Sequence, residues 1–187
     1  MKTGAESIRV MHPLFQAEEG GSIPTSALLL TLEEIDFCRA RELNKLWHSR
    51  LPRIGTGFIK SQPFPCFAAT FEGVIYAVAI WSNPIARKLP QQEWLELRRL
   101  AIAPDAPRNT ASRMLRIMAL LLRKSRPEVT RLISYHDTEV HTGCIYKAAG
   151  WERTLVGTSF VTWNRPGRWR PKDQSTAAKQ RWEKSLT

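Results

Sequence analysis

The stretch ELRRLAIAPDAPRNTASRMLRIMALLLRKSRPEVTRLISYHDTEVHTGCIYKAAGW, residues 96–151, decides the fold. Its apolar and polar runs alternate in the order strand, turn, helix, strand, helix. We predict a strand over 96–103, a helix over 109–124, a strand over 130–135 and a helix over 141–149. The first helix begins directly after a polar turn, where unpaired backbone N–H groups and the helix dipole suit a phosphate. The sequence therefore predicts a core that holds a phosphate-containing compound.

The segment before this stretch supplies further strands and a helix. Residues 66–71 and 74–81 are apolar and rich in aromatic and β-branched side chains. Only Glu72-Gly73 separates them, which indicates a hairpin. Thr31-Leu-Glu-Glu34 has the form of a capping box and predicts a helix that runs to about Trp47. We therefore expect an α/β (α+β) fold with a mixed central β-sheet flanked by helices.

Composition divides the chain into three parts. Residues 1–27 contain Gly-Gly and two prolines without a sustained period, and we expect a loosely ordered N-terminal arm. Residues 28–163 hold the predicted domain, which ends with an alternating strand over 155–163. Residues 164–187 form a basic, tryptophan-containing C-terminal extension.

The overall charge indicates which class of partner this chain binds. Its 187 residues carry a formal net charge of +11, with 28 lysines and arginines against 17 acidic residues. Such an excess favours a polyanionic partner, above all a nucleic acid. No apolar run approaches the roughly 20 residues that span a bilayer, and the N-terminus lacks the apolar core of a signal peptide. The three cysteines match neither a zinc pattern nor a disulfide framework, so we expect free thiols, no membrane partner and a cytoplasmic location.

The C-terminal extension has the composition of a nucleic-acid-binding segment. Basic residues that neutralise phosphates alternate there with aromatic residues that stack on exposed bases. The candidate nucleic-acid-binding residues are Arg165, Arg168, Trp169, Arg170, Lys172, Lys179 and Arg181. The alternative is a basic tail whose tryptophans, Trp169 and Trp182, pack back on the domain.

Two motifs resemble the GNAT superfamily of N-acetyltransferases. Leu100-Ala-Ile-Ala-Pro104 is similar to the central strand of that family, and Tyr146-Lys-Ala-Ala-Gly150-Trp151 is similar to its Tyr-x-x-x-Gly-Phe ending. The resemblance covers about residues 66–161 and implies a GNAT-like acyltransferase fold. It also implies that backbone amides after the central strand hold the pyrophosphate of acetyl-CoA or a related acyl-CoA. Tyr146 would protonate the departing thiolate.

The cofactor site that this resemblance implies lies at the end of the strand and in the turn that follows. Its candidate residues are Arg99, Leu100, Ala101, Ile102, Arg108, Asn109, Thr110, Ala111, Ser112 and Arg113. Members of the family normally place glycines in this turn, because glycine lets the backbone approach a phosphate closely. Residues 107–112 read Pro-Arg-Asn-Thr-Ala-Ser and contain no glycine. The hydroxyls of Thr110 and Ser112 and the charge of Arg108 are what this turn offers instead.

A narrower resemblance takes account of the missing glycines. Pro107-Arg-Asn-x-x-Ser112, Ser134-Tyr-x-Asp137 and Gly143-x-Ile-Tyr-x-Ala-x-x-Trp151 are similar to motifs of the phage Mom family and its bacterial relatives. This resemblance implies an anti-restriction, DNA-modifying enzyme that converts adenine to an N6-carbamoylmethyl form in the bacterial cytoplasm. The implied catalytic residues are Asp137, Tyr146 and His48, and the same three residues would hold iron if the family's proposed metal binds. An adenine inside a duplex would have to be flipped out to be modified.

Each of these residues also has a structural alternative. Tyr146 suits a packed aromatic residue on a helix, and Asp137 suits a cap of the following helix. His48 stands at a predicted helix end, where a histidine interacts favourably with the negative terminus. His136 and His141, which flank Asp137, are expected on the surface.

Two other functions remain open. The first is an ordinary acetyl-CoA-dependent N-acetyltransferase that acts on a small amine, a protein or an aminoacyl-tRNA. The second is a non-catalytic nucleic-acid-binding protein on the same fold. The oligomeric state is open between a monomer and a homodimer.

Overall fold

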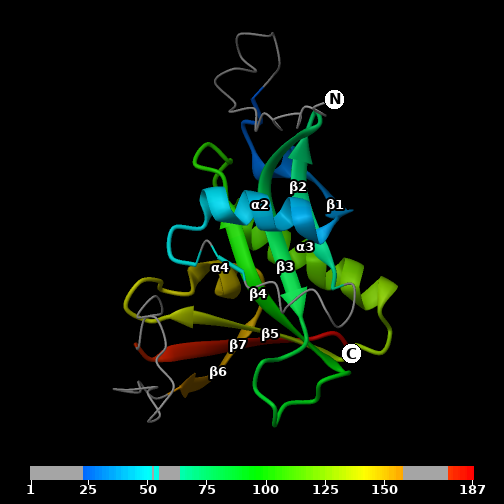
Figure 1. Ribbon diagram of the computed structural model, residues 1–187, viewed down its shortest axis with the longest axis vertical. Coiled ribbons are helices and arrows are strands. Elements are labelled where there is room, and N and C mark those ends of the chain that lie inside the picture. The colour runs from blue at the N-terminus through cyan, green and yellow to red at the C-terminus, as the bar shows by residue number, and fades with distance from the viewer. Residues whose placement is uncertain (1–22, 52, 55–63, 158–176) are drawn as a thin grey trace, which may run out of the picture.

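The computed structural model describes residues 23–51, 53–54, 64–157 and 177–187. They form a seven-stranded sheet with helices on both faces (Figure 1). The strands are β1 (Thr31–Ile35), β2 (Cys66–Phe71), β3 (Val74–Ser82), β4 (Trp94–Ile102), β5 (Arg131–Asp137), β6 (Glu152–Gly157) and β7 (Lys179–Ser185). The helices are the 3-10 helix η1 (Ala27–Leu29) and the α-helices α2 (Phe37–Trp47), α3 (Thr110–Ser125) and α4 (Cys144–Ala148).

The sheet is mixed, with the strand order β1-β2-β3-β4-β5-β7-β6. Strands β1 to β4 form an antiparallel meander, whereas β5 lies parallel to β4. The last strand of the chain, β7, pairs antiparallel with β5 on one side and with β6 on the other. The prediction of a C-terminal extension therefore needs correcting: residues 179–185 belong to the sheet, because their backbone groups complete the ladders of β5 and β6.

Most of the predicted elements are confirmed within a few residues. The hairpin of β2 and β3 turns at Glu72 and Gly73, whose φ angles are +49° and +80°. Positive φ at both central residues is the geometry that two-residue hairpin turns prefer. Helix α3 begins and ends one residue later than predicted, whereas α4 is shorter than predicted. The final strand starts earlier, at Glu152, and the predicted residues 158–163 lie outside the described part, as do residues 1–22 of the predicted arm.

The capping box predicted at Thr31–Glu34 is wrong. These residues form β1, which pairs with β2 over the register Thr31↔Thr70 to Ile35↔Cys66. The N-cap of α2 is Asp36, whose carboxylate accepts a hydrogen bond from Arg39 N at 2.9 Å. Helix α2 therefore begins after the strand, at the first residue whose side chain can cap it.

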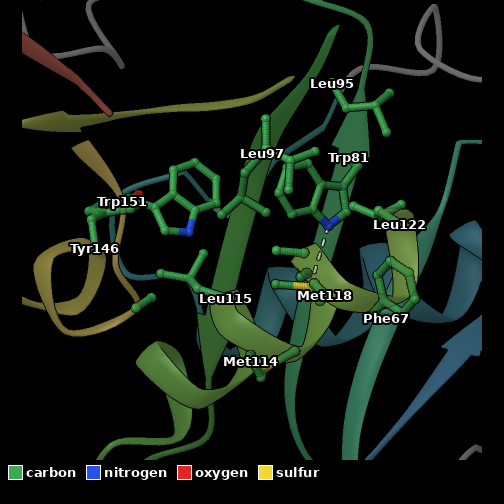
Figure 2. Packing of buried hydrophobic residues seen from close by; sticks show 14 of the residues in the cluster. Phe67, Trp81, Leu95, Leu97, Met114, Leu115, Met118, Leu122, Tyr146 and Trp151 are labelled. Carbon is green, nitrogen blue, oxygen red and sulfur yellow. Dashed lines mark hydrogen bonds between the residues drawn. The ribbon is translucent and has the colours of Figure 1, made fainter. Parts of the chain in front are cut away.

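Helix α3 packs on one face of the sheet and forms the larger part of the core. Met114, Leu115, Met118 and Leu122 recur at helical spacing and are fully buried. They lie against Trp81 of β3, whose indole N–H donates to Met118 Sδ at 3.3 Å (Figure 2). This packing fixes the N-terminal end of α3 relative to β4.

Helix α2 covers the other face over β2, β3 and β4, in front of the strands in Figure 1. Its buried Ala40 and Leu43 pack against Val78, Ile80 and Ala101. The two cores give a three-layer arrangement in which β3 and β4 are central. No helix among the described residues is long and apolar enough to cross a membrane.

Candidate functional site

The parallel strands β4 and β5 pair over only part of their length. Their register runs from Trp94↔Arg131 to Leu97↔Ser134 and stops there. Beyond Leu97, β4 stays with β3, and beyond Ser134, β5 stays with β7, so the strands run apart (Figure 1). A bulge at Arg98 shifts the β3–β4 register at the same level. The sheet therefore opens into a fork whose vertex is the Leu97–Ser134 pair.

The turn after β4 leads into α3 without a glycine. Asn109, the N-cap of α3, adopts the left-handed conformation with φ +69°. Asparagine is among the few non-glycine residues that tolerate this region. Asn109 therefore supplies the backbone conformation for which a glycine is normally used.

Backbone amides, not hydroxyls, are the groups that this turn can offer to an anion. The hydroxyls of Thr110 and Ser112 are donated internally, to Pro107 O at 2.7 Å and to Asn109 O at 3.0 Å. Helical hydrogen bonding begins with Arg113 N, which donates to Asn109 O. Within the described residues, the N–H groups of Ala111 and Ser112 therefore have no acceptor and stand at the positive end of the dipole. The prediction that the two hydroxyls bind phosphate is corrected in this respect.

A cavity of about 280 Å³ opens in front of these amides. Its walls come from the end of β4, the turn, the first turn of α3, and α4. The lining residues are Ile102, Pro107, Asn109, Thr110, Ala111, Ser112, Cys144, Ile145 and Ala148. Five predicted cofactor residues are thus brought together here, and the three from α4 were not predicted, because no local signal showed that α4 faces the start of α3.

Other predicted cofactor residues lie elsewhere. Arg99 donates to Leu51 O and Arg53 O, at 3.2 and 3.3 Å, in the loop after α2. Burial lowers the pKa of Arg99 to about 10, with a smaller contribution from Arg98. Arg113 donates to Leu28 O at 3.3 Å. These arginines support neighbouring backbone and do not line the cavity.

The other three predicted cofactor residues do not line the cavity either. Arg108 is exposed beside the turn. Ala101 lies in the core beneath α2, and Leu100 packs at the edge of the core beneath α3. In the strand itself, only Ile102 reaches the cavity.

Tyr146 lies at the vertex of the fork. Its hydroxyl is 2.8 Å from Ser134 Oγ, and the side chain is buried. Burial raises the pKa of Tyr146, against a smaller lowering by the Ser134 hydrogen bond. The phenol therefore stays protonated at neutral pH and is a proton donor rather than a base.

An aromatic cluster surrounds Tyr146. Trp182 stacks on it at 5.5 Å between centroids, and Trp151 meets it edge-on at 5.7 Å. Figure 2 shows Tyr146 and Trp151 side by side beside the core of α3. His136, expected on the surface, is only 7% exposed and accepts a hydrogen bond from Trp182 Nε1 at 2.8 Å. The expectation for His136 is therefore wrong, because β7 covers it.

Asp137 ends β5, three residues beyond Ser134. Its Oδ2 pairs with Lys179 Nζ at 2.7 Å, and its Oδ1 accepts from Glu139 N at 3.0 Å. Side chains alternate along a strand, so Asp137 faces the side of the sheet opposite to Ser134 and Tyr146. It holds the following turn and lies at the rim of the fork.

His48 is the C-cap of α2 and is half-buried. Its Nδ1 accepts from Leu51 N at 3.1 Å and from Arg50 N at 3.4 Å. Its pKa is lowered by burial and by the nearby charges of Arg99 and His141. The imidazole is therefore neutral at pH 7 and shapes the loop that Arg99 also holds.

The predicted iron-binding trio does not fit a preformed metal site. Among residues 23–51, 53–54, 64–157 and 177–187 there is no group of three His, Cys, Asp or Glu residues that could hold a metal. The Tyr146 hydroxyl is bound by Ser134, and the Asp137 carboxylate is bound by Lys179. The side chains of Asp137 and Tyr146 also lie on opposite faces of the sheet at β5, which separates two of the three proposed metal ligands.

Only two predicted nucleic-acid-binding residues can be placed. Lys179 pairs with Asp137, and Arg181 pairs with Glu183 at 2.7 Å. Both lie in β7. Lys179 joins it to β5, whereas Arg181 pairs within β7 and donates to Thr154 of β6 at 3.3 Å. The others, Arg165, Arg168, Trp169, Arg170 and Lys172, fall outside the described residues.

Comparison with protein families identifies the relatives of this chain. The model of the Mom protein family matches residues 67–186, which include the fork, the turn and β7. The chain belongs to the Mom protein family. No sequence match is found among the curated proteins.

Solved structures with the same fold are acetyltransferases. The ribosomal-protein-S18-alanine N-acetyltransferase from Escherichia coli has a TM-score of 0.60 and 15% identity, over 84% of this chain and 94% of that one. A Bacillus subtilis acetyltransferase in complex with CoA has a TM-score of 0.61 and 11% identity, over 84% and 99%. A Salmonella typhimurium structure with its cofactor acetyl-CoA has a TM-score of 0.60 and 13% identity, over 85% and 95%. This Mom protein therefore has a GNAT fold, as predicted.

Proposed function

We propose that this Mom-family protein transfers an acyl group from an acyl-CoA-type donor to the N6 amine of adenine in DNA. The observation that carries the proposal is the position of Tyr146, whose hydroxyl lies at the vertex of the fork beside Ser134. A proton donor is needed there because the leaving thiolate must be protonated. Family membership and the net charge of +11 favour DNA as the acceptor.

The start of α3 fits the pyrophosphate of the donor. The open amides of Ala111 and Ser112 line the cavity, and two N–H groups at a helix N-terminus are a recurrent site for phosphate. Exposed Arg108, directly before the turn, adds a positive charge at the entrance. The donor's thioester would be the electrophile.

In the proposed reaction, the adenine nitrogen attacks the thioester carbonyl carbon. A nitrogen–carbon bond forms and the carbon–sulfur bond breaks, with the electron pair leaving on sulfur. Tyr146 gives its proton to that sulfur. Asp137, at the rim of the fork, is the candidate acceptor for the proton that the nitrogen loses, and Lys179 holds its carboxylate.

The acceptor approaches from the side of the sheet opposite to α4 in this proposal. That side carries His48 and Arg99 near the fork, and both are held by the loop after α2. Donor and acceptor would then meet through the opening between β4 and β5. A flipped adenine can reach such a site, whereas a base inside a duplex cannot.

The carbamoylmethyl group of a Mom-type product is bonded to nitrogen through a methylene carbon, whereas attack on a thioester carbonyl gives an N6-acyl adenine. The mass of the product therefore tells whether the reaction is the acyl transfer proposed here or a different reaction that forms the carbamoylmethyl group. The test is mass spectrometry of nucleosides from DNA of cells that express the protein, with Tyr146→Phe as the control. We expect a modified adenosine that is lost in the variant; unmodified DNA with retained CoA binding would instead indicate an acetyltransferase with another acceptor.

The contribution of residues 164–176 to DNA binding needs substitutions rather than truncation, because β7 follows them. Replacing Arg165, Arg168, Arg170 and Lys172 by serine is expected to weaken binding and to flatten its salt dependence. Each lost phosphate contact lowers the slope of log K against log salt by about 0.9. An unchanged slope would rule out this segment as the DNA-binding element.

A further inference from the structure

Tyr146 stands on a helix that is too short to orient it. Helix α4 has five residues, and its N-cap is Gly143, which is left-handed with φ +75° and makes no side-chain capping hydrogen bond. A single helical turn has few internal hydrogen bonds, so its position depends on tertiary contacts. The contacts that reach Tyr146 come from β5, from β7 and from Trp151, the residue before β6.

The contact from β7 is made by Trp182. Its indole ring stacks on the Tyr146 ring with an interplanar angle of 15° and 5.5 Å between centroids. Its N–H donates to His136 Nδ1 at 2.8 Å, and the His136 ring in turn stacks on Tyr146 at 6.1 Å. All three side chains are buried, at 6–7% exposure. The three rings thus form a triangle with centroid separations of 5.5–6.1 Å, in which the phenol contacts two rings that are themselves joined by a hydrogen bond.

The hydrogen bond from Trp182 also determines which nitrogen of the neutral His136 ring carries the proton. Because Nδ1 accepts from Trp182, the neutral ring carries its proton on Nε2. Burial lowers the pKa of His136, as do His141, Arg153 and Lys179, while Asp137 acts in the opposite sense. The cluster next to Tyr146 is therefore uncharged, which leaves Ser134 as the polar partner of the phenol.

The start of α4 packs tightly against the rings of Trp182 and His136. A Cβ atom on Gly143 would lie 2.6 Å from Trp182 Cζ2 and 2.8 Å from His136 Cε1. The start of α4 is thus in van der Waals contact with the same two rings that hold Tyr146. Any movement of Trp182 displaces both the start of the helix and the tyrosine on it.

We propose that Trp182 is a positioning residue, which keeps the Tyr146 hydroxyl at Ser134 through its stacked ring and its N–H bond to His136. The proposal rests on the role of Tyr146 as proton donor in the proposed function. It gives the last strand of the chain a part in the reaction, although β7 lies more than thirty residues beyond Tyr146. Loss of the Trp182 N–H lets His136 turn and lets the phenol leave Ser134.

The first test observes Tyr146 directly by fluorine NMR of full-length protein labelled with 3-fluorotyrosine. The chain has three tyrosines, so Tyr146→Phe assigns the signal. Trp182→Phe keeps an aromatic ring and removes the N–H. Trp81→Phe is the matched control, because Trp81 is also buried, its N–H also makes one hydrogen bond, to Met118, and its ring stacks on Trp151 rather than on Tyr146. We expect the Tyr146 signal to move or broaden in Trp182→Phe and to stay in place in Trp81→Phe; no change, or equal changes, would overturn the proposal.

The second test measures acyl transfer from acetyl-CoA by the same variants. Misplacing the proton donor lowers the rate of transfer without weakening donor binding, so kcat should fall about tenfold in Trp182→Phe while KM for acetyl-CoA stays within about twofold. A kcat equal to that of Trp81→Phe would contradict the positioning role. If the wild-type protein transfers no acyl group to any acceptor, the proposed function fails, and the NMR comparison still decides whether Trp182 positions Tyr146.

Discussion

The hydroxyl of Tyr146 lies 2.8 Å from the hydroxyl of Ser134, at the last residue pair that joins β5 to β4. This contact places a buried phenol where the sheet opens, with the amides of α3 and their cavity on the same side. The arrangement links the proposed donor site to the proposed site of proton transfer. Five consequences can be measured.

Replacing Tyr146 by phenylalanine removes the proton donor and keeps the ring. Loss of general acid catalysis lowers kcat by about 10²-fold or more. The lost hydrogen bond to Ser134 lowers the free energy of unfolding by about 1 kcal/mol. Steady-state kinetics and urea unfolding check both values. Tyr76→Phe is the control, because the Tyr76 hydroxyl is influenced by Asp105 and Glu72 and not bound to Ser134; a Tyr146→Phe enzyme with wild-type kcat would contradict the assigned role.

Replacing Ala111 by proline removes one open amide. Proline is tolerated in the first turn of a helix, so α3 should still form. One charge-assisted hydrogen bond contributes about 1.5–3 kcal/mol, so CoA affinity should fall tenfold or more. Isothermal titration with CoA measures this. Ala111→Gly keeps the amide and should bind normally; equal affinities for both variants would exclude the amide as a phosphate ligand.

Two glycines with the same backbone conformation should respond differently to alanine. Gly143 and Gly150 have φ +75° and +72°, so either substitution costs about 1 kcal/mol of stability from left-handed strain. A Cβ on Gly150 meets nothing closer than 3.6 Å, whereas one on Gly143 overlaps Trp182 and His136. Gly143→Ala should therefore cost about 1–3 kcal/mol more. Urea denaturation of both variants decides, and similar costs would show that α4 can shift.

Stability should fall in mild acid because His136 is buried and neutral. Its pKa is lowered from 6.5, so below that pH the unfolded chain binds more protons than the folded one. The free energy of unfolding then decreases as pH falls below about 6.5. His136→Asn keeps an acceptor for Trp182 and removes the titrating group, so its stability should depend less on pH. An equally steep decline in the variant would assign the effect elsewhere, His48 being the next candidate because its pKa is also lowered.

Deleting residues 177–187 should prevent folding. Without β7, β5 and β6 lose the strand that joins them, and the buried Trp182 and Leu186 leave the core. Circular dichroism and solubility of the truncated chain check this, with removal of the exposed Thr187 alone as the control. If the truncated protein folds, β7 is not required for the rest of the sheet to form.

Local sequence patterns predicted the secondary structure well in segments whose pattern fits only one type of element. The hairpin at Glu72-Gly73 and the amphipathic helix α3 are confirmed, since turn chemistry and helical spacing are properties of neighbouring residues. The pattern at Thr31–Glu34 misled because a threonine followed by glutamate three residues later satisfies a capping box and also an edge strand. Pairing with β2 decided in favour of the strand, and Asp36 then capped the helix.

The candidate site was predictable in part. The motifs at residues 107–112 and at Tyr146 lie on the cavity and at the fork, and the resemblance to the Mom family is confirmed. The sequence motif assigned no role to Ser134, and His136 was expected on the surface. For Trp182, the alternative that it packs back on the domain is the one the structure confirms. Trp182 meets Tyr146 because β7 inserts between β5 and β6, whereas Ser134 and His136 contact it from β5. No sequence pattern near Trp182 indicates that β7 inserts between these strands.

The sequence by itself determined most of the helices and strands, the basic character and the family, because periodicity, charge and motif spacing are carried by residues close together in the chain. The tertiary structure decided which of them form the site. It placed residues 179–185 of the expected C-terminal extension as a strand between β5 and β6, used the hydroxyls of Thr110 and Ser112 internally, and placed Asn109 in the left-handed conformation of a missing glycine. The physical reason is that strand pairing and burial join residues far apart in the chain, such as Trp182 and His136, which are 46 positions apart, and such pairing leaves no local trace in the sequence.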